Sequence, residues 1–432
     1  MTKIIALITA VLTVWLSCTP FSLLFKKTDV PHRYIVIMHN TADENAFAFM
    51  KDTYGEIDPN NEIMYASGVS GPMLLTDSKE LIAAKTETAF AAAIKNNIPV
   101  WFQIDDVNNS HAGYIDNCMT CEKWYENSLN VEKLAFGEDA HLARYWFNWG
   151  IWRTTPATPC LNSPTFVSFI QSQLNEGFIP VLKKYLNILK EQKKEYLFAG
   201  ICVGWETKIP DFSDIPDGTV DQHGDVIQSY EQSETGYRAL ENLGYTAEKL
   251  AVEAKKKGIS EKQLMFDLLC SVEHDYSEMI SKVIFDAGVE KTKIFTHYTT
   301  GDNLNAIYKD IDFSFPYIDT AMNEYCTPGY TVGINPSTKK IRHLKAKITL
   351  SSPEQKYYGA VESYATELNE SKKASERFFD RLFNSGALIA ALYGFDDADT
   401  SPFYFSKDRN APLNQTIKEL VSPKTNKKLF DK

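Results

Sequence analysis

The chain has 432 residues and a formal net charge of −11, with 44% hydrophobic and 23% charged residues. This composition is typical of a globular protein and argues against collagen, a coiled coil or extensive disorder. Lys and Arg are scattered and outnumbered by Asp and Glu, so we expect no nucleic-acid partner. The length suits two or three ordinary domains, or one α/β barrel with long insertions.

The N-terminal segment predicts export. Residues 1–3 form a short basic start, and residues 4–16 are all apolar or Thr. This is the length of a signal-peptide core and is too short for a membrane span. Residues 16–18, Leu-Ser-Cys, resemble the bacterial lipobox, which implies that Cys18 is lipidated and becomes the new N-terminus. An ordinary cleavage site and an uncleaved anchor are the alternatives.

Eight apolar runs of strand length are separated by helical patterns. This alternation is typical of βαβ units with a parallel sheet. Helical patterns occupy residues 78–96, 164–195, 246–257, 260–271 and 276–287. The strand candidates are residues 34–38, a weaker run near 62–65 or 71–75, then 99–104, 198–206, 293–298, 312–319, 358–362 and 387–393.

These elements predict an α/β fold, a closed (β/α)8 TIM barrel with a long insertion after strand three, from about residue 107 to 163. An open doubly wound sheet is the alternative. It has less support because no G-x-G-x-x-G follows the first strand and no P-loop occurs. The domain plan is then a signal peptide over residues 1–17, a linker over 18–30, the barrel over 31–400, and an extension over 401–432 that packs on or trails the barrel.

Polar residues follow most of the apolar runs. Because the C-terminal ends of barrel strands meet at one face, we expect these side chains to converge there. Asp and Asn also cap the helices that follow such strands, and a lone His is often only a structural partner. The residues are His39 and Asn40, Asp105 and Asp106, Glu206, His297 and Tyr298, Asn323 and Glu324, and Glu362.

Two glutamates in this set indicate a specific chemistry. Glu206 ends the fourth run and Glu362 ends the seventh, and two carboxylates facing one cleft are the apparatus of glycoside hydrolysis. The pattern resembles the (β/α)8 retaining glycoside hydrolases of clan GH-A, without indicating one family. The resemblance implies that Glu206 is the acid/base and Glu362 the nucleophile, with carboxyl groups roughly 5–5.5 Å apart.

One departure from that clan leaves an alternative open. The strand-four glutamate of clan GH-A usually follows Asn, whereas Glu206 follows Trp205. An Asn-Glu pair occurs instead at Asn323-Glu324, after the sixth run, so Glu324 is the alternative catalytic carboxylate. The remaining strand-end residues His39, Asp105, Asp106, His297, Tyr298 and Asn323 are then expected to bind substrate hydroxyl groups.

Tryptophans near these strands favour a carbohydrate ligand. Trp146, Trp149 and Trp152 lie close together in the long insertion, and Trp205 adjoins the proposed acid. Indole faces stack on the apolar face of a pyranose, so we expect Trp149, Trp152 and Trp205 to bind substrate. The alternative is that the insertion cluster is a small satellite core.

The sequence therefore predicts an exported glycoside hydrolase that acts on an oligo- or polysaccharide without a cofactor or metal. We expect a periplasmic or outer-membrane-anchored bacterial lipoprotein, attached to the membrane through Cys18. A non-catalytic glycan-binding lipoprotein on a degenerate barrel is one alternative. A metal-dependent hydrolase using His39, Asp105 and His297 is another, although no HxH or HExxH pattern occurs.

Overall fold

Eight parallel strands form the centre of the molecule, in the order β7-β6-β3-β2-β1-β10-β9-β8. The computed structural model describes residues 31–39, 44–106, 124–133, 135–137, 144–148, 151–155, 159–207, 218, 220, 224–226, 235–299, 316–333, 338–364, 366–395 and 405–422. The strands are β1 (Arg33–His39), β2 (Ile63–Met73), β3 (Val100–Asp105), β6 (Phe198–Val203), β7 (Ile294–Thr296), β8 (Gly329–Gly333), β9 (Tyr358–Ser363) and β10 (Ala387–Leu392).

The two ends of this strand order, β7 and β8, meet and close the sheet. The Tyr298 N–H donates to the Gly329 carbonyl over 3.1 Å, and the Tyr298 carbonyl accepts from the Thr331 N–H over 2.9 Å. A further parallel bridge joins Phe295 and Thr327. Because a parallel sheet that closes on itself leaves no free edge, this seam completes a barrel. The predicted (β/α)8 barrel is therefore confirmed.

The strands agree with the sequence prediction except at the sixth position. β2 is one strand that joins both weaker candidates. The predicted strand over 312–319 is wrong, because residues 316–320 form the helix α10 (Pro316–Thr320) and the sixth strand is β8. Pro316 has no N–H for a sheet but fits the first turn of a helix, which favours the observed structure. Residues 312–315 lie outside the described part of the chain.

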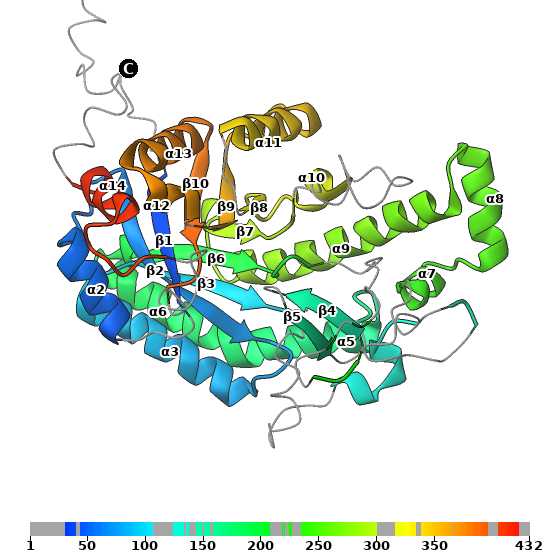
Figure 1. Cartoon of the computed structure of the whole chain (residues 1–432). Coiled ribbons are helices and arrows are strands. Elements are labelled where there is room, and N and C mark those ends of the chain that lie inside the picture. The colour runs from blue at the N-terminus through cyan, green and yellow to red at the C-terminus, as the bar shows by residue number, and fades with distance from the viewer. Residues whose placement is uncertain are drawn as a thin grey trace, which may run out of the picture.

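Helices surround the strands (Figure 1). The patterns at 260–271 and 276–287 belong to one long helix, α9, and not to two, because no Gly or Pro interrupts residues 272–275. The helices besides α10 are α2 (Glu44–Tyr54), α3 (Lys79–Asn96), α5 (Pro164–Ser172), the π-helix η5 (Gln173–Phe178), α6 (Ile179–Glu191), α7 (Tyr237–Asn242), α8 (Ala247–Lys257), α9 (Glu261–Asp286), α11 (Thr338–Ser351), α12 (Thr366–Glu370), α13 (Lys372–Asn384) and α14 (Pro412–Leu420).

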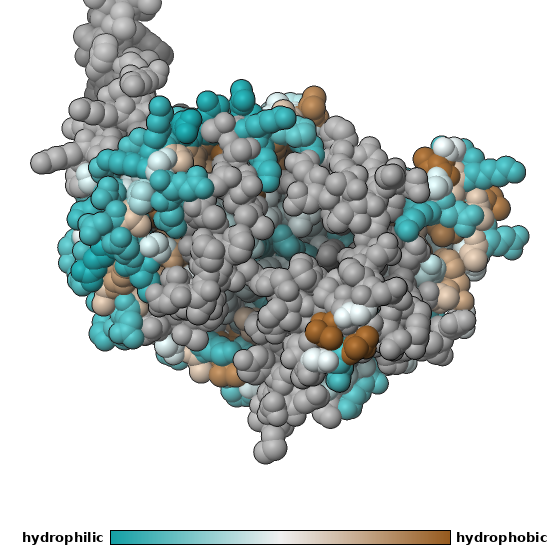
Figure 2. All heavy atoms as spheres, viewed as in Figure 1, coloured by the Kyte–Doolittle hydropathy of each residue, from teal (hydrophilic) through white to brown (hydrophobic). Residues whose placement is uncertain are grey.

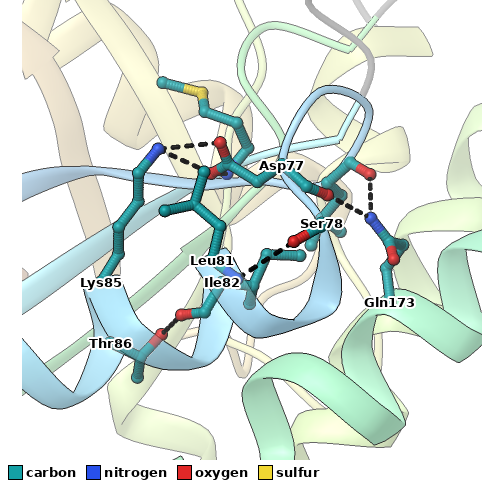
Figure 3. A network of polar contacts seen from close by, with 9 residues as sticks. Asp77, Ser78, Leu81, Ile82, Lys85, Thr86 and Gln173 are labelled. Atoms are coloured by element: carbon teal, nitrogen blue, oxygen red, sulfur yellow. Dashed lines mark hydrogen bonds and ion pairs between the residues drawn. The ribbon is translucent and has the colours of Figure 1, made fainter. Parts of the chain in front are cut away.

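A polar network fixes the loop between β2 and α3 (Figure 3). Ser78 caps α3, since its hydroxyl accepts a backbone N–H of the first turn over 3.3 Å. Lys85 contacts both oxygens of Asp77, at 2.8 and 2.9 Å. The buried Gln173 amide donates to the carbonyls of Leu74 and Asp77 over 2.9 and 2.8 Å. The π-helix η5 is thereby tied to the loop that follows the second strand.

The insertion and the C-terminal segment lie against this barrel in the described part of the chain. Within the insertion, β4 (Arg144–Asn148) and β5 (Ile151–Thr155) form an antiparallel hairpin. At the other end of the chain, Asn414 of α14 accepts a hydrogen bond from Tyr54 of α2 over 2.6 Å. On the face that Figure 2 shows, many of the described residues are hydrophilic, and the hydrophobic patches are small and separate. None of the described helices is long and apolar enough to span a membrane.

Candidate active site

Four strands deliver polar side chains to one end of the barrel. Glu206 lies just beyond β6, and His297 directly follows β7. Thr331 lies within β8, and Glu362 is the penultimate residue of β9. These are the C-terminal ends of the fourth to seventh barrel strands, the face where (β/α)8 enzymes hold their active sites.

The four side chains form one continuous polar chain. The Thr331 hydroxyl donates to Glu206 Oε1 over 2.6 Å. His297 Nε2 lies 2.9 Å from Thr331 Oγ1 and 3.1 Å from Glu362 Oε2. One oxygen of Glu206 and one of Glu362 lie within 4.8 Å of each other. The structure thus brings together the two glutamates that the sequence singled out.

The backbone at Glu206 is strained. Its φ of 52° lies in the left-handed region, which non-glycine residues rarely adopt. Gly204 has a φ of 84°, and a Cβ there would lie only 2.6 Å from Thr207 Oγ1. Strained backbone of this kind costs roughly 1–3 kcal/mol and tends to occur at functional sites. The turn after β6 therefore sets the direction of the Glu206 side chain.

Aromatic residues surround the two carboxylates. The Tyr364 hydroxyl donates a short hydrogen bond to Glu362 Oε1. Burial, together with the neighbouring Glu362 carboxylate, raises the pKa of Tyr364 well above its ordinary value, so the phenol remains a donor. Trp205 and Tyr393 pack edge to face with ring centroids 5.8 Å apart. Trp205 therefore lies beside Glu206 as expected, and its predicted contact with sugar remains a prediction.

Asp106 is a buried carboxyl group next to this chain. Only 1% of the residue is exposed, and burial raises the pKa of Asp106 to about 7. The Thr207 hydroxyl lies 3.5 Å from Asp106 Oδ1 and favours the charged form. At neutral pH this carboxyl group is therefore poised between its protonated and ionised forms.

His39 and Asp105 are buried at the ends of β1 and β3. His39 Nε2 lies 2.6 Å from the Ser67 hydroxyl of β2, and its ring packs against Phe47 and Phe395. Asp105 is the last residue of β3 and is 3% exposed. Both lie at the expected end of the barrel, where their role in binding hydroxyl groups stays a prediction.

Three predicted residues are not brought to the site. The buried Tyr298 side chain reaches away to α9, where its hydroxyl donates to the Glu273 carbonyl over 3.1 Å. Asn323 and Glu324 precede β8 and so lie at the opposite end of the barrel. The Asn323 carbonyl accepts from Lys291 Nζ over 3.3 Å, and Lys291 itself precedes β7. The strand assignment over 312–319 caused this error, since it placed the Asn-Glu pair after the sixth strand.

Several predicted positions lie outside the part of the chain that the structure describes. They include Asn40, Trp149 and the lipobox residue Cys18. For Trp146 and Trp152 only the backbone, in the hairpin β4–β5, is described. Their stacking on sugar remains a prediction.

The sequence reasoning missed three polar partners of the site. Gln103 of β3 lies two residues before Asp105, and strand alternation places it on the same side of the sheet. Its amide nitrogen lies 3.2 Å from His297 Nδ1. Thr331 was missed because its strand was assigned elsewhere, and Tyr364 because it follows β9 by one residue.

This arrangement has two possible chemistries. Glu206 and Glu362 each bring one carboxylate oxygen to within 4.8 Å of the other, and two carboxylates this close can act as the pair that cleaves a glycosidic bond. Glu206, His297 and Glu362 also each offer an atom that could bind a metal ion. In Figure 2, hydrophilic described residues are visible deep in the middle of the face shown.

Comparisons with known proteins give structural similarity only. No protein-family model and no curated protein matches the sequence. The chain is similar to a ruminal GH26 endo-β-1,4-mannanase, with 10% identity and a TM-score of 0.37 over 91% of this chain and 64% of that one. It is also similar to the endo-1,4-β-mannanase from Rhizomucor miehei, with 9% identity and a TM-score of 0.34 over 92% of this chain and 96% of that one. The chain thus spans about 64% of the length of the ruminal enzyme. The (β/α)8 assignment rests on the strand order and the seam of this chain itself.

Proposed function

We propose that the protein is a glycoside hydrolase that cleaves a glycosidic bond with net retention. Glu206 is the acid/base and Glu362 the nucleophile. The observation that supports this is the approach of these two carboxylates, from the ends of the fourth and seventh barrel strands, to within 4.8 Å. A nucleophile at this separation reaches the anomeric carbon directly, without an intervening water.

The contacts of Glu362 suit a nucleophile. It is 4% exposed, accepts a hydrogen bond from the Tyr364 hydroxyl at Oε1, and has Oε2 3.1 Å from His297 Nε2. These contacts orient the carboxylate toward the site. Attack on the anomeric carbon forms a covalent glycosyl ester as the leaving oxygen departs, and water later hydrolyses that ester.

The contacts of Glu206 suit an acid/base. The Thr331 hydroxyl donates to Oε1 and so orients the carboxyl group, which gives its proton to the leaving oxygen. In the second step Glu206, now ionised, accepts a proton from the attacking water. Asp105, Asp106 and His39 lie at the same end of the barrel as candidate partners of sugar hydroxyl groups.

Substrate should first be sought with a panel of aryl glycosides and of plant and host polysaccharides. With an active substrate, Glu362→Gln should abolish turnover. Glu206→Gln should lower kcat roughly 10²–10⁴-fold on poor leaving groups while sparing aryl glycosides that need no proton. The matched control is Glu324→Gln, at the opposite end of the barrel, which should leave kcat unchanged. Loss of activity in the control with a normal Glu362→Gln variant would contradict the assignment.

Stereochemistry gives a second test. Proton NMR of the first sugar released should show the anomer of the substrate, since two displacements at one carbon restore its configuration. Inversion would contradict the nucleophilic role of Glu362. Binding of glycans by the protein without hydrolysis of any substrate tested would favour the non-catalytic alternative.

A metal-dependent hydrolase is the second candidate, because Glu206, His297 and Glu362 could together ligate a divalent cation. Treatment with a chelator distinguishes the two candidate functions. A glycosidase with a carboxylate pair should keep its activity after prolonged dialysis against EDTA, whereas a metal-dependent hydrolase should lose it and recover on adding metal.

We further propose that the protein is exported and anchored to a bacterial membrane through a lipid on Cys18. The support is the lipobox-like Leu-Ser-Cys at residues 16–18 after an apolar run. The mature protein should partition into detergent, and Cys18→Ala should release or mislocalise it. Unchanged membrane association of that variant would contradict the lipid anchor.

A further inference from the structure

The side chain of Gln103 determines which nitrogen of His297 can carry a proton. Gln103 Nε2 lies 2.6 Å from the Gly204 carbonyl. A carbonyl oxygen only accepts, so the amide group must present its NH2 end there. The same nitrogen lies 3.2 Å from His297 Nδ1. Since an amide NH2 only donates, Nδ1 must accept with its lone pair and has no proton.

The other side of the imidazole leads to the same conclusion. The Thr331 hydroxyl donates its single hydrogen to Glu206 Oε1 over 2.6 Å. Its oxygen is therefore free to accept, and His297 Nε2 lies 2.9 Å away. Nε2 also lies 3.1 Å from Glu362 Oε2, a carboxylate oxygen that only accepts. Both sides of the ring thus require the tautomer with the proton on Nε2.

This tautomer conflicts with metal binding. Nε2 is the nitrogen that lies beside Glu362, and a metal ion held between the two glutamates would need its lone pair. A metal-binding imidazole usually donates its other N–H to a carboxylate or carbonyl acceptor. Here the group that faces Nδ1 is a donor, the reverse of that arrangement.

We propose that Gln103 is a positioning residue that holds the proton of His297 on Nε2 and thereby keeps divalent cations out of the Glu206–His297–Glu362 cluster. The inference deepens the proposed function, because it explains why a set of groups able to ligate a metal acts instead as a carboxylate pair. Gln103 is fully buried in β3, so its amide is held in place and cannot turn toward solvent.

The decisive variant is Gln103→Glu, which keeps the size of the side chain and replaces the donor facing Nδ1 by an acceptor. Nδ1 can then hold the proton, and Nε2 can ligate a metal. Calorimetric titration with zinc chloride should show binding about 10- to 100-fold tighter than to the wild type, the usual range for a residue that orients a ligand. Adding His297→Gln to this variant should abolish the gain.

Two controls separate this effect from the added charge and from lost stability. Calcium binding should change much less than zinc binding, because imidazole nitrogen favours zinc and carboxylates alone favour calcium. Gln173→Glu is the matched variant, since Gln173 is also buried and its amide nitrogen also faces two acceptors, here the carbonyls of Leu74 and Asp77 in the loop after β2 (Figure 3). It should cost similar stability and leave zinc binding unchanged. Equal zinc affinity of the wild type and Gln103→Glu would overturn the proposal.

The tautomer can also be measured in the unaltered protein, which keeps the proposal testable if Gln103→Glu fails to fold. Nitrogen-15 NMR of protein labelled on histidine, with the His297 signals identified by His297→Gln, should show a protonated Nε2 and an unprotonated Nδ1. A proton on Nδ1 would overturn the proposal. Neither this measurement nor the zinc titration needs a substrate, so their outcome is independent of whether the glycosidase assignment holds.

Discussion

The Thr331 hydroxyl donates to Glu206 Oε1 over 2.6 Å, so a side chain of the sixth barrel strand holds a carboxylate that follows the fourth. The strand between them, β7, is three residues long and is followed by His297, which also contacts Thr331. The proposed acid/base is therefore positioned by a residue distant in sequence and not by its own loop alone.

The first prediction concerns Thr331. Thr331→Val keeps the shape of the side chain but removes the hydrogen bond to Glu206 and the acceptor for His297. We expect kcat/KM to fall at least about tenfold, and the free energy of unfolding to fall by about 1–3 kcal/mol, because polar atoms lose their partners. Thr331→Ser retains the hydroxyl and should retain most activity. Steady-state kinetics measure kcat/KM of the two variants, and urea denaturation measures their free energy of unfolding. Full activity of Thr331→Val would show that the hydrogen bond is dispensable.

The second prediction concerns the donor to Glu362. Tyr364→Phe removes the hydroxyl that contacts the proposed nucleophile, and we expect kcat to fall about 10- to 100-fold, the value of a hydrogen bond to a charged group. Tyr358→Phe is the matched control. Tyr358 begins β9, at the opposite end of that strand from Glu362, and its hydroxyl lies 2.7 Å from the Ser385 hydroxyl, so its removal should leave kcat unchanged. A larger loss in Tyr358→Phe than in Tyr364→Phe would contradict this account.

The third prediction is a pH dependence of stability caused by Asp106. Its pKa rises on folding from an ordinary value of 3.8 to about 7, because the carboxyl group is buried. Between these values the folded state keeps the proton while the unfolded state has lost it, so the free energy of unfolding falls as pH rises. The penalty is absent below about pH 4 and reaches about 4 kcal/mol above pH 7.

Asp106→Asn removes this titration while keeping the size of the group. Relative to the wild type, the variant should therefore be stabilised increasingly as pH rises from 4 to 7. Urea denaturation of both proteins at several pH values in this window gives the difference. A difference that stays constant with pH would show that Asp106 does not titrate there.

The fourth prediction concerns the turn before Glu206. Gly204→Ala adds a Cβ at a φ of 84°, only 2.6 Å from Thr207 Oγ1. Gly258→Ala, at the end of α8, adds a Cβ at a φ of 71° with no atom within 4 Å. Both should lose about 1 kcal/mol through backbone strain, but only Gly204→Ala should lose more and also lower kcat, because Glu206 moves with the turn. Thermal unfolding and kinetics of the pair check this.

The sequence predicted most of the barrel because its strands are buried on both sides. All seven residues of β1 and all six of β10 are buried, so residues 34–38 and 387–392 form continuous apolar runs in the sequence. β8 could not be found in this way. A Cβ on Gly329 would collide with the Thr296 carbonyl oxygen, so the close contact at the seam requires glycine at this position. The strand therefore lacks the apolar residue that would have made it recognisable in the sequence.

The candidate site was predictable in part for a similar reason. Glu206 and Glu362 were found because each follows or ends an apolar run, a local pattern. Gln103 and Thr331 belong to the site through contacts across strands, which depend on the register of neighbouring strands. Alternation within β3 gives the side of the sheet on which Gln103 lies, but its partner on another strand depends on the register of the closed sheet as a whole.

The seam between β7 and β8 lies between the two strands that carry the proposed catalytic pair. Glu206 follows β6, one strand to one side of the seam, and Glu362 ends β9, one strand to the other side. The distance between the two carboxylates therefore depends on the contacts that hold β7 against β8. Local opening of these contacts would lengthen that distance toward the spacing at which a water molecule, and not Glu362, attacks the sugar.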